Sequence, residues 1–273
     1  MALNERGLPS GASVELAPGT VTLVGGGPGD PGLITLAGLS ALRAADVVLY
    51  DHLAPLELLA ETRADAELID VGKLPRGAFT PQEEINRLLI EYARADRKVV
   101  RFKGGDSFVF GRGGEEVQAC AEAGVPVRVI PGVSSAIAAP ELAGIPVTHR
   151  GLSQGFAVVS AHVGPSSPAS TVNWPALAAT GTTLVVLMGV HTLPEVCRTL
   201  LSHGLPPDTP AAVIENAGRP NARVVRGVLG ALTDLVAQAG VASPAVTVIG
   251  QVAGFNQPIH GHPHESGHLP TEG

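Results

Sequence analysis

The sequence from Val21 to Gly32 reads VTLVGGGPGDPG, a short apolar run that leads into a loop of glycine and proline. An apolar run of this length is typical of a buried strand, and the glycines let the backbone approach a ligand with its amide donors exposed. The loop lacks the Gly-Lys-Ser/Thr end of a Walker loop, and its two prolines interrupt the helix start that a dinucleotide fingerprint requires. We therefore expect a strand and a ligand-binding loop of another kind, with a plain tight turn as the alternative.

On both sides of this stretch, short β-branched runs alternate with amphipathic segments. Strands are expected at residues 21–24, 47–50, 68–71, 99–102 and 127–130, and helices at 33–44, 81–95 and 114–123. Further strands are expected at residues 156–160, 183–188, 211–214, 223–226 and 245–249. Such alternation is typical of a mostly parallel sheet covered by helices, so the fold class is α/β.

The two sets of strands indicate two α/β domains, residues 19–150 and 151–255, with a ligand cleft between them. The second domain is expected to have a more mixed sheet, because a turn-like Gly-Arg-Pro-Asn segment at 218–221 suits a hairpin. Residues 1–18 and 256–273 lack apolar periodicity and are expected to be flexible tails.

Composition narrows the class of function. A net charge of −7 over 273 residues disfavours nucleic acid and anionic membranes as partners, so a polyanionic substrate must meet a local cluster of cations. Cys120 and Cys197 have no C-x-x-C spacing, which argues against a disulfide framework or a thiolate metal site. No apolar run is long enough for a membrane helix, and the first residues contain no signal-peptide core, so a cytoplasmic location is expected.

A second motif, GGDSFVFGRGGEE, runs from Gly104 to Glu116 directly after an expected strand. The carboxyl ends of strands are where open α/β sheets bind ligands. Asp106 could accept hydrogen bonds from a ribose or an ammonium group, and we favour a functional role for it. Glu115 and Glu116 fall in the first turn of the next helix, where carboxylates favour the helix dipole, so for them we favour a structural role.

A third segment, PGVSS at residues 131–135, again joins a strand to a helix, where Ser134 could serve as an N-cap, as a ligand contact or as both. It is followed by GIPVTHR at residues 144–150, an abrupt turn with two potentially cationic side chains at the expected domain junction.

Seven motifs in order closely resemble those of the tetrapyrrole methylases: VGGGPGDP, VVLYDHL, VGK, GGDSFVFGRGGEE, PGVSS, GIPVTHR and LMG. The resemblance extends from about Thr20 to Gly254, nearly the whole chain apart from its tails. It implies two domains that hold S-adenosyl-methionine in a folded conformation between them. It also implies a homodimer.

The resemblance assigns cofactor contacts to ten positions of this sequence. They are Pro28, Gly104, Gly105, Asp106, Val109, Ser134, Ser135, Met188, Ala217 and Ala245. Without the motif, Met188 would be interpreted as a core methionine. Two departures from the family pattern are small: Ser107 stands where proline commonly follows Gly-Gly-Asp, which makes the loop less stiff, and Ser135 stands where alanine is frequent.

Within the family, the motifs are most similar to those of members that methylate uroporphyrinogen III at C-2 and C-7. That reaction gives precorrin-2 by way of precorrin-1, for sirohaem or cobalamin synthesis. Methylation of a pyrrole carbon requires the loss of a proton elsewhere on the macrocycle, and the family assigns proton transfer to the residues that match Asp51 and Lys73. From sequence alone, Asp51 would be an N-cap and Lys73 a solvated turn residue.

The substrate implied by the resemblance carries eight carboxylates, which need cations. Candidates near the motifs are Lys73, Arg76, Arg101, Lys103, Arg112, His149 and Arg150. We favour Arg112, His149 and Arg150 as the substrate ligands, and the alternative for Arg101 is an exposed strand residue.

Three alternatives stay open at this point. The chain could methylate a later precorrin, although the YDHL, VGK and THR motifs argue against that, or it could be a diphthine synthase or ribosomal RNA 2′-O-methylase of the same fold. It could also be a non-catalytic binder of S-adenosyl-methionine or tetrapyrrole. No glycine-rich dinucleotide domain precedes Thr20, so a stand-alone methylase is expected. Four histidines between His260 and His268 indicate a disordered tail with incidental metal affinity, or a holding site for cobalt, nickel or iron.

Overall fold

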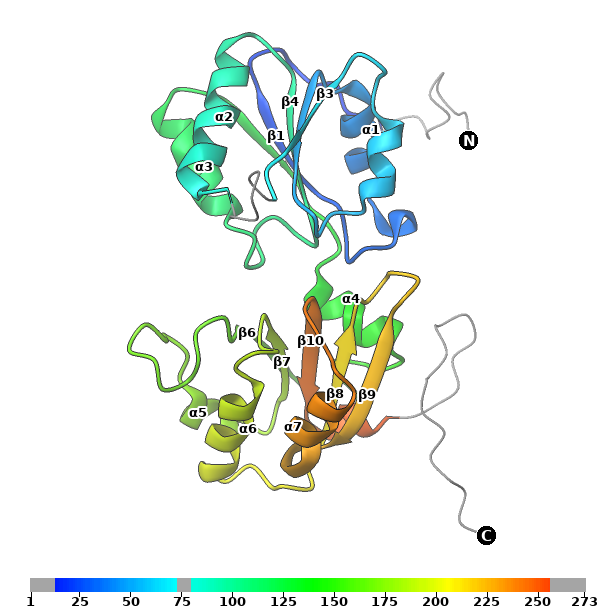
Figure 1. Ribbon diagram of the computed structural model, residues 1–273, viewed down its shortest axis with the longest axis vertical. Coiled ribbons are helices and arrows are strands. Elements are labelled where there is room, and N and C mark those ends of the chain that lie inside the picture. The colour runs from blue at the N-terminus through cyan, green and yellow to red at the C-terminus, as the bar shows by residue number, and fades with distance from the viewer. Residues whose placement is uncertain (1–12, 73–79, 256–273) are drawn as a thin grey trace. The chain divides into compact units, whose positions relative to one another are not determined.

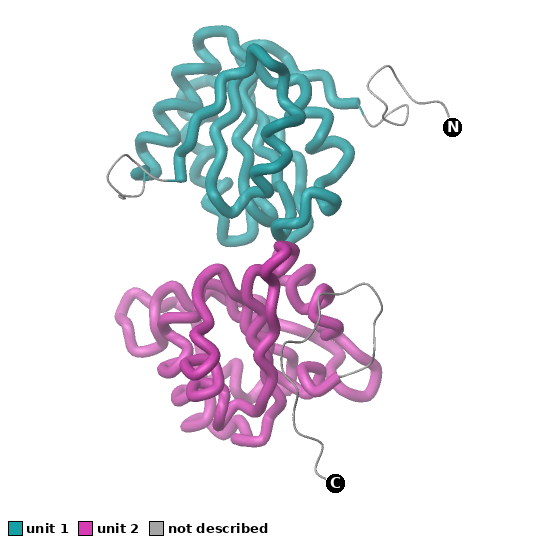
Figure 2. Tube along the Cα trace, turned by 45° about the vertical axis from the view of Figure 1, so that its right-hand side comes forward, with its two compact units in different colours: residues 1–134 teal, residues 135–273 magenta. Residues whose placement is uncertain are grey.

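The computed structural model describes residues 13–72 and 80–255, and the chain divides into two compact units (Figure 2). Unit 1 is Met1–Ser134 and unit 2 is Ser135–Gly273. Each is an α/β unit with its own sheet, in agreement with the predicted fold class. The division falls before residue 135, whereas the sequence analysis placed the domain boundary after Arg150.

Unit 1 contains a five-stranded parallel sheet in the order β3-β2-β4-β1-β5 (Figure 1). Its strands are β1 (Val21–Gly25), β2 (Val47–Tyr50), β3 (Glu67–Asp70), β4 (Val99–Lys103) and β5 (Val127–Ile130). Because all five run the same way, their carboxyl ends meet at one edge of the sheet. The central strands β1 and β4 are buried along their whole length, as expected for a parallel sheet covered on both faces.

Helices cover both faces of this sheet (Figure 1). They are α1 (Leu36–Ala44), α2 (Gln82–Arg94) and α3 (Gly113–Glu122), with short 3₁₀ turns η1 (Pro31–Leu33) and η2 (Leu56–Glu61). Successive strand residues alternate between the faces, so Phe102 packs in the cluster beneath α1, and Val99 packs in the cluster beneath α2 and α3. Helix α1 begins three residues later than predicted, because the Thr35 side chain caps it by accepting from the Gly38 amide at 3.0 Å.

Unit 2 contains a mixed five-stranded sheet in the order β6-β7-β10-β8-β9. Its strands are β6 (Phe156–Ser160), β7 (Thr183–Leu187), β8 (Pro210–Glu215), β9 (Arg223–Val228) and β10 (Ala245–Ile249). Strands β6 and β7 are parallel, and the other neighbouring pairs are antiparallel. Strands β8 and β9 form the predicted hairpin, which confirms the mixed sheet.

The helices of unit 2 explain where the chain divides. They are α4 (Ser135–Leu142), α5 (Trp174–Ala179), α6 (Leu193–Ser202) and α7 (Leu229–Gln238), followed by the 3₁₀ turn η3 (Gln251–Gly254). Helices α5, α6 and α7 cover one face of the sheet, and α4 packs on the other. Ala136 and Ala139 of α4 are buried against Val185 and Ala212 of that sheet, so α4 belongs to unit 2.

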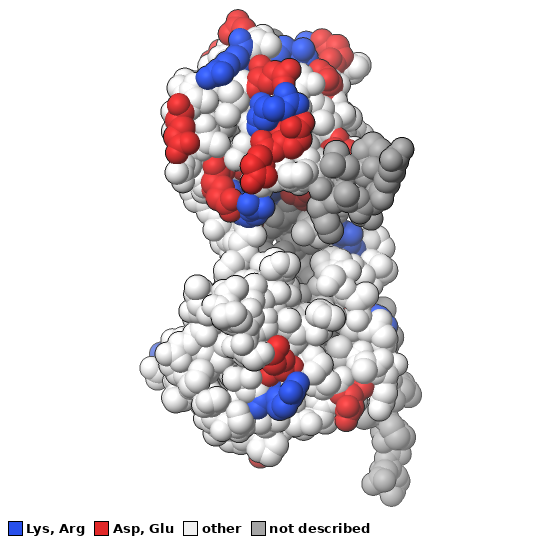
Figure 3. Space-filling model, turned by 60° about the vertical axis from the view of Figure 1, so that its left-hand side comes forward, with Lys and Arg blue, Asp and Glu red and all other residues white. Residues whose placement is uncertain are grey.

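Charged side chains of both signs are mixed on the surface of unit 1. In Figure 3 its Lys and Arg side chains lie among Asp and Glu side chains. Ion pairs such as Arg63–Asp46 at 3.0 Å and Arg87–Glu84 at 2.7 Å produce this mixing. The face shown therefore presents no continuous basic surface in the described part of the chain. Within the same described residues, every helix is too short or too polar to span a membrane.

Candidate functional site

Three loops meet at the carboxyl edge of the unit 1 sheet, after β1, β4 and β5. The backbones of Gly27 and Gly105 pair with each other, with N–O distances of 3.1 Å and 2.7 Å, and the Gly26 amide donates to the Lys103 carbonyl at 2.7 Å. Gly27 and Gly105 both have positive φ, at 84° and 64°, a conformation that glycine adopts without strain. The loop after β1 is thus fixed backbone to backbone against the loop after β4.

Asp106 joins the loop after β4 to the loop after β5. Its Oδ1 accepts from the Phe108 amide at 2.9 Å, and its Oδ2 accepts from the Gly132 amide at 3.0 Å. Both carboxylate oxygens therefore have backbone donors. The predicted functional residue lies at this edge of the sheet, and it also has a structural task.

We expect Asp106→Asn to loosen these loops. An amide nitrogen in place of either oxygen would direct N–H toward N–H, so one backbone donor would lose its acceptor, which costs about 1–3 kcal/mol of unfolding free energy. Chemical denaturation should show this loss, and calorimetry should show weaker binding of S-adenosyl homocysteine.

The matched control for that change is Asp30→Asn. Asp30 uses one oxygen, which accepts from the Gly32 amide at 2.7 Å, and asparagine can keep that bond. The free energy of unfolding of the Asp30→Asn variant should stay within about 0.5 kcal/mol of that of the unchanged protein. Equal losses for the two variants would contradict the linking role of Asp106.

Asp51 lies directly after β2, at the same edge. Its Oδ1 accepts from the Leu53 amide at 3.1 Å and from the Gly104 amide at 3.3 Å. Its Oδ2 accepts from Nη2 of Arg101 at 3.3 Å, and 24% of the side chain stays exposed. The structure thus places this predicted catalytic residue beside the Gly104 loop, with part of its carboxylate open to solvent. Lys73 and Arg76 lie outside the described residues.

A histidine–aspartate pair that the sequence analysis missed stands next to Asp51. Nε2 of His52 lies 2.7 Å from Oδ2 of Asp70, and Oδ1 of Asp70 accepts from the Gly72 amide at 2.8 Å. Parallel pairing places Tyr50 opposite Asp70, which brings the chain after β2 beside the chain after β3. The sequence signal was available, because Asp70 lies in the run at residues 68–71 and His52 follows the run at residues 47–50, both predicted as strands.

Arg112 and Val109 lie in the loop after β4. Arg112 precedes α3 with a left-handed φ of 58°, and its exposed guanidinium pairs with Glu115, with an Nη2–Oε2 distance of 2.7 Å. The hydrogen bond from Arg112 holds the pKa of Glu115 below its ordinary value. Val109 is 37% exposed. Both predicted residues can therefore reach a ligand, while Glu115 stands in the first turn of α3 as the structural interpretation predicted.

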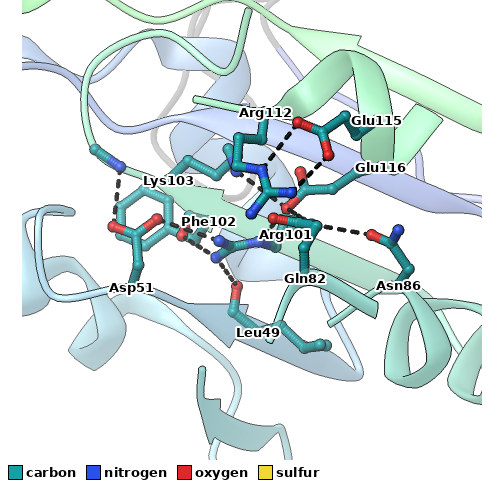
Figure 4. A network of polar contacts seen from close by, with 11 residues as sticks. Leu49, Asp51, Gln82, Asn86, Arg101, Phe102, Lys103, Arg112, Glu115 and Glu116 are labelled. Atoms are coloured by element: carbon teal, nitrogen blue, oxygen red, sulfur yellow. Dashed lines mark hydrogen bonds and ion pairs between the residues drawn. The ribbon is translucent and has the colours of Figure 1, made fainter. Parts of the chain in front are cut away.

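Arg101 and Lys103 correct the sequence analysis. They were candidates for binding substrate carboxylates, with an exposed strand residue as the alternative for Arg101, yet the two residues are 3% and 4% exposed. Both donate at 3.0 Å to Oε1 of Glu116, which α3 places over β4 and which is fully buried (Figure 4). Burial lowers the pKa of Lys103 below its ordinary value. These three charges form a buried network that is closed to a substrate.

The three predicted residues at the sheet edge of unit 2 lie together. Met188 follows the carboxyl end of β7, Ala217 follows that of β8, and Ala245 begins the antiparallel strand β10 between them. Met188 and Asn216 have positive φ, at 56° and 52°, which is uncommon for residues other than glycine and frequent at functional sites. Met188 is 45% exposed, so the interpretation as a core methionine does not apply.

His149 and Arg150 form an exposed turn of unit 2. Nδ1 of His149 donates to the Arg150 carbonyl at 2.8 Å, and its ring packs on Phe255 with a centroid distance of 5.4 Å. Ser134 ends unit 1, and Ser135 begins α4. Pro28 lies half-buried in the loop after β1.

The whole set of motifs matches one family. The profile of the tetrapyrrole (corrin/porphyrin) methylases matches residues 20–233, which include the loops after β1, β4 and β5 and the edge of unit 2 at Met188 and Ala217. The chain belongs to the tetrapyrrole methylase family.

Several tetrapyrrole methylases resemble the chain along most of its length. A uroporphyrinogen-III C-methyltransferase of Priestia megaterium is 44% identical over 238 residues, which are 87% of this chain and 100% of that protein. The structure of a uroporphyrin-III C-methyltransferase of Thermus thermophilus, in complex with S-adenosyl homocysteine, matches with a TM-score of 0.72 at 41% identity. That match covers 85% of this chain and 92% of the Thermus chain.

A more distant tetrapyrrole methylase is also similar in structure. A cobalt precorrin-4 methyltransferase of cobalamin biosynthesis matches with a TM-score of 0.78 at 27% identity, over 86% of this chain and 96% of that one. Siroheme synthases are also similar in sequence, and the chain spans about half their length, 50% to 53% in the examples from Gluconacetobacter diazotrophicus and Klebsiella pneumoniae.

Proposed function

We propose that this chain is a methyltransferase that transfers methyl groups from S-adenosyl-methionine to C-2 and C-7 of uroporphyrinogen III. The product is precorrin-2, formed by way of precorrin-1. The observation that carries the proposal is the 44% identity to the Priestia megaterium enzyme over that enzyme's full length. It is supported by two carboxylates at the sheet edge where α/β folds bind ligands: Asp51 accepts from Gly104 in the loop after β4, and Asp106 of that loop accepts from Gly132 in the loop after β5.

The edge of unit 1 fits S-adenosyl-methionine chemically. The backbones approach each other closely at Gly25 and Gly132. A Cβ on either residue would lie 2.6 Å from the Cα of the other, well inside van der Waals contact. The backbones therefore pack directly on one another here, and the polar groups at this part of the edge belong to the backbone and to the Asp106 carboxylate. Exposed apolar side chains stand beside them: Leu53, Val109 and Val133 are 54%, 37% and 37% exposed. Backbone polar groups next to apolar side chains suit a nucleoside.

The cofactor contacts are proposed accordingly. In unit 1 they are Pro28, Gly104, Gly105, Asp106, Val109 and Ser134, and in unit 2 they are Ser135, Met188, Ala217 and Ala245. When bound, S-adenosyl-methionine supplies an electrophilic methyl group on a sulfonium.

Asp51 is proposed to take up a proton from the macrocycle after each methyl transfer. Its carboxylate is oriented by two backbone amides and one guanidinium, and it keeps an exposed part through which a proton can pass. Lys73 is the second proposed proton-transfer group, and it lies outside the described residues. In-line positioning of donor and acceptor supplies much of such a rate, so each group contributes one part of it.

Three exposed cations are proposed to bind the substrate carboxylates: Arg112, His149 and Arg150. The guanidinium of Arg112 already holds a carboxylate, that of Glu115, in a two-point arrangement with Nε–Oε1 and Nη2–Oε2 distances of 2.9 Å and 2.7 Å. A propionate or acetate group of the substrate can replace that partner with the same geometry.

The experiment is an anaerobic incubation of the purified chain with S-adenosyl-methionine and enzymatically generated uroporphyrinogen III, followed by mass spectrometry of the oxidised products. Two added methyl groups are expected. If no methyl group is added although the chain binds S-adenosyl homocysteine, the proposed substrate is refuted and the cofactor assignment stays in place.

Methylation of a later precorrin is the second candidate, favoured by the TM-score of 0.78 to the cobalt precorrin-4 methyltransferase. The same assay with later precorrins separates the two. A non-catalytic binder of the cofactor is tested by Asp51→Asn, which should slow turnover by about 10²- to 10⁴-fold and leave cofactor binding intact.

The product is proposed to enter sirohaem or cobalamin synthesis in the cytoplasm, and the chain is proposed to act as a homodimer. Both cysteines are free and buried, which is consistent with a reducing compartment.

A further inference from the structure

We propose that Arg101 is a positioning residue for methyl transfer, and that it acts by fixing the carboxylate of Asp51. This inference rests on the catalytic role proposed for Asp51. It starts from an unusual location for charge: Arg101 and Lys103 both point from the central strand β4 into the face covered by α2 and α3, where the other strand residues are apolar (Figure 4). Charges are rarely buried in this way unless they are paired.

Every nitrogen of the Arg101 guanidinium has a partner. Nε donates to Glu116 at 3.0 Å, and Nη1 donates to the carbonyls of Phe102 and Leu49 at 3.2 Å and 3.4 Å. Nη2 donates to Oδ2 of Asp51 at 3.3 Å. The strand, its neighbour β2 and the helix α3 therefore fix the plane of the guanidinium, and Nη2 is presented to Asp51 in one direction.

The backbone completes the arrangement around Asp51. Oδ1 accepts from the amides of Leu53 and Gly104. Among the contacts of the described residues, Oδ2 accepts from the side chain of Arg101. Rotation of the carboxylate would break bonds at both oxygens. A base that is held in one orientation gains rate through positioning.

Charge supports the same conclusion. In their ionised forms, Arg101, Lys103 and Glu116 carry one net positive charge in a buried site, and the carboxylate of Asp51 brings the cluster to neutrality. Lys103 shares Glu116 with Arg101 and makes no hydrogen bond with Asp51 among the described contacts. The two cations thus have the same buried partner but only Arg101 reaches the proposed base, so Lys103 is a matched control.

The test compares Arg101→Met with Lys103→Met in the uroporphyrinogen III assay. Each variant removes one buried cation from Glu116. We expect kcat of Arg101→Met to fall on the order of 10- to 100-fold, with KM for S-adenosyl-methionine and binding of S-adenosyl homocysteine unchanged. We expect Lys103→Met to keep kcat within about twofold, whatever it loses in folding stability. Equal kcat values for the two variants would overturn the inference.

Arg101→Lys provides a variant that keeps the positive charge beside Glu116 and folds more readily. A lysine has a single nitrogen, which cannot bond to Glu116 and Asp51 in two fixed directions, so kcat should fall here as well. Full kcat in this variant would refute a role that depends on the guanidinium.

A double variant separates this inference from the proposed function. In an Asp51→Asn background, Arg101→Met should lower kcat no further, because both changes disable one unit. A further loss equal to that in the unchanged protein would show that Arg101 acts independently of Asp51. If Asp51→Asn alone keeps full activity, the catalytic role of Asp51 fails, and the inference fails with it. A wild-type chain that does not methylate uroporphyrinogen III at all would instead reject the proposed function.

Discussion

Replacing Glu116 with glutamine is expected to lower the free energy of unfolding by about 3–5 kcal/mol. Glu116 is fully buried, and its Oε1 accepts from Arg101 and Lys103 at 3.0 Å each. The variant leaves two buried cations, Arg101 and Lys103, with Asp51 as the one carboxylate still bonded to this cluster, so one positive charge is uncompensated. An uncompensated buried charge costs much more than the net value of the pair it came from, so the loss should be large. Urea denaturation followed by circular dichroism measures it.

The neighbouring Glu115 is the control. It stands in the same first turn of α3, but its side chain is 54% exposed and its partner Arg112 is exposed as well. Glu115→Gln removes an equal charge from the same helix turn. Because exposed ion pairs add little to stability, the free energy of unfolding should hardly change. If both variants lost the same stability, the helix dipole rather than the buried network would be the cause.

The loss in Glu116→Gln should depend on pH. Burial places the pKa of Lys103 below its ordinary value of 10.5, and Glu116 opposes this shift, so its removal lowers the pKa of Lys103 further. Between the folded and unfolded pKa values, the unfolded chain binds more protons, and stability therefore rises with pH. As pH rises from neutral toward 10.5, the variant should recover part of its loss because Lys103 becomes neutral. A deficit that grows over this range would contradict the assignment.

Much of the fold follows from local pattern. The runs at residues 156–160 and 245–249 were predicted with the bounds that the structure gives to β6 and β10, because β-branched residues between turn signals favour a strand. The domain boundary was harder to predict from the sequence. Most residues of α4 are small or apolar, and their pattern does not indicate which sheet the helix packs on, so the tertiary structure assigns it to unit 2.

The site was predictable to the extent that it lies at strand ends. Asp51 and Asp106 follow predicted strands, and the parallel sheet brings them to one edge, as expected. The structural role favoured for Glu116 agrees with its place in the first turn of α3. Arg101 was misjudged because its environment depends on how α3 packs over β4, which the periodicity of neither segment reveals. A signal was present nonetheless: two cations at alternate positions of the apolar run VVRFK share one face of the strand and need a buried anion.

Gly132→Ala is expected to have a comparably large effect, by a steric route. A Cβ at this position would lie 2.6 Å from Cα of Gly25 and closer still to the carbonyl oxygen of Gly105. The obstructing atoms are backbone, so no side chain can rotate away, and the loops after β1, β4 and β5 must separate. The Gly132 amide would then leave Oδ2 of Asp106. We expect a loss of about 3 kcal/mol or more in unfolding free energy and at least about a 100-fold loss in affinity for S-adenosyl homocysteine.

Gly114→Ala is the control that distinguishes this collision from a general intolerance of the glycine-rich motifs. Gly114 lies in the first turn of α3, and a Cβ there would meet no atom within 4 Å. Alanine also has the higher helix propensity, so this variant should gain about 0.5–1 kcal/mol and bind the cofactor as before. The two substitutions add the same methyl group. If Gly132→Ala lowers the free energy of unfolding and Gly114→Ala raises it, the effect arises where the three loops contact each other. A Gly132→Ala variant with unchanged stability and affinity would mean that these backbones are not packed against each other.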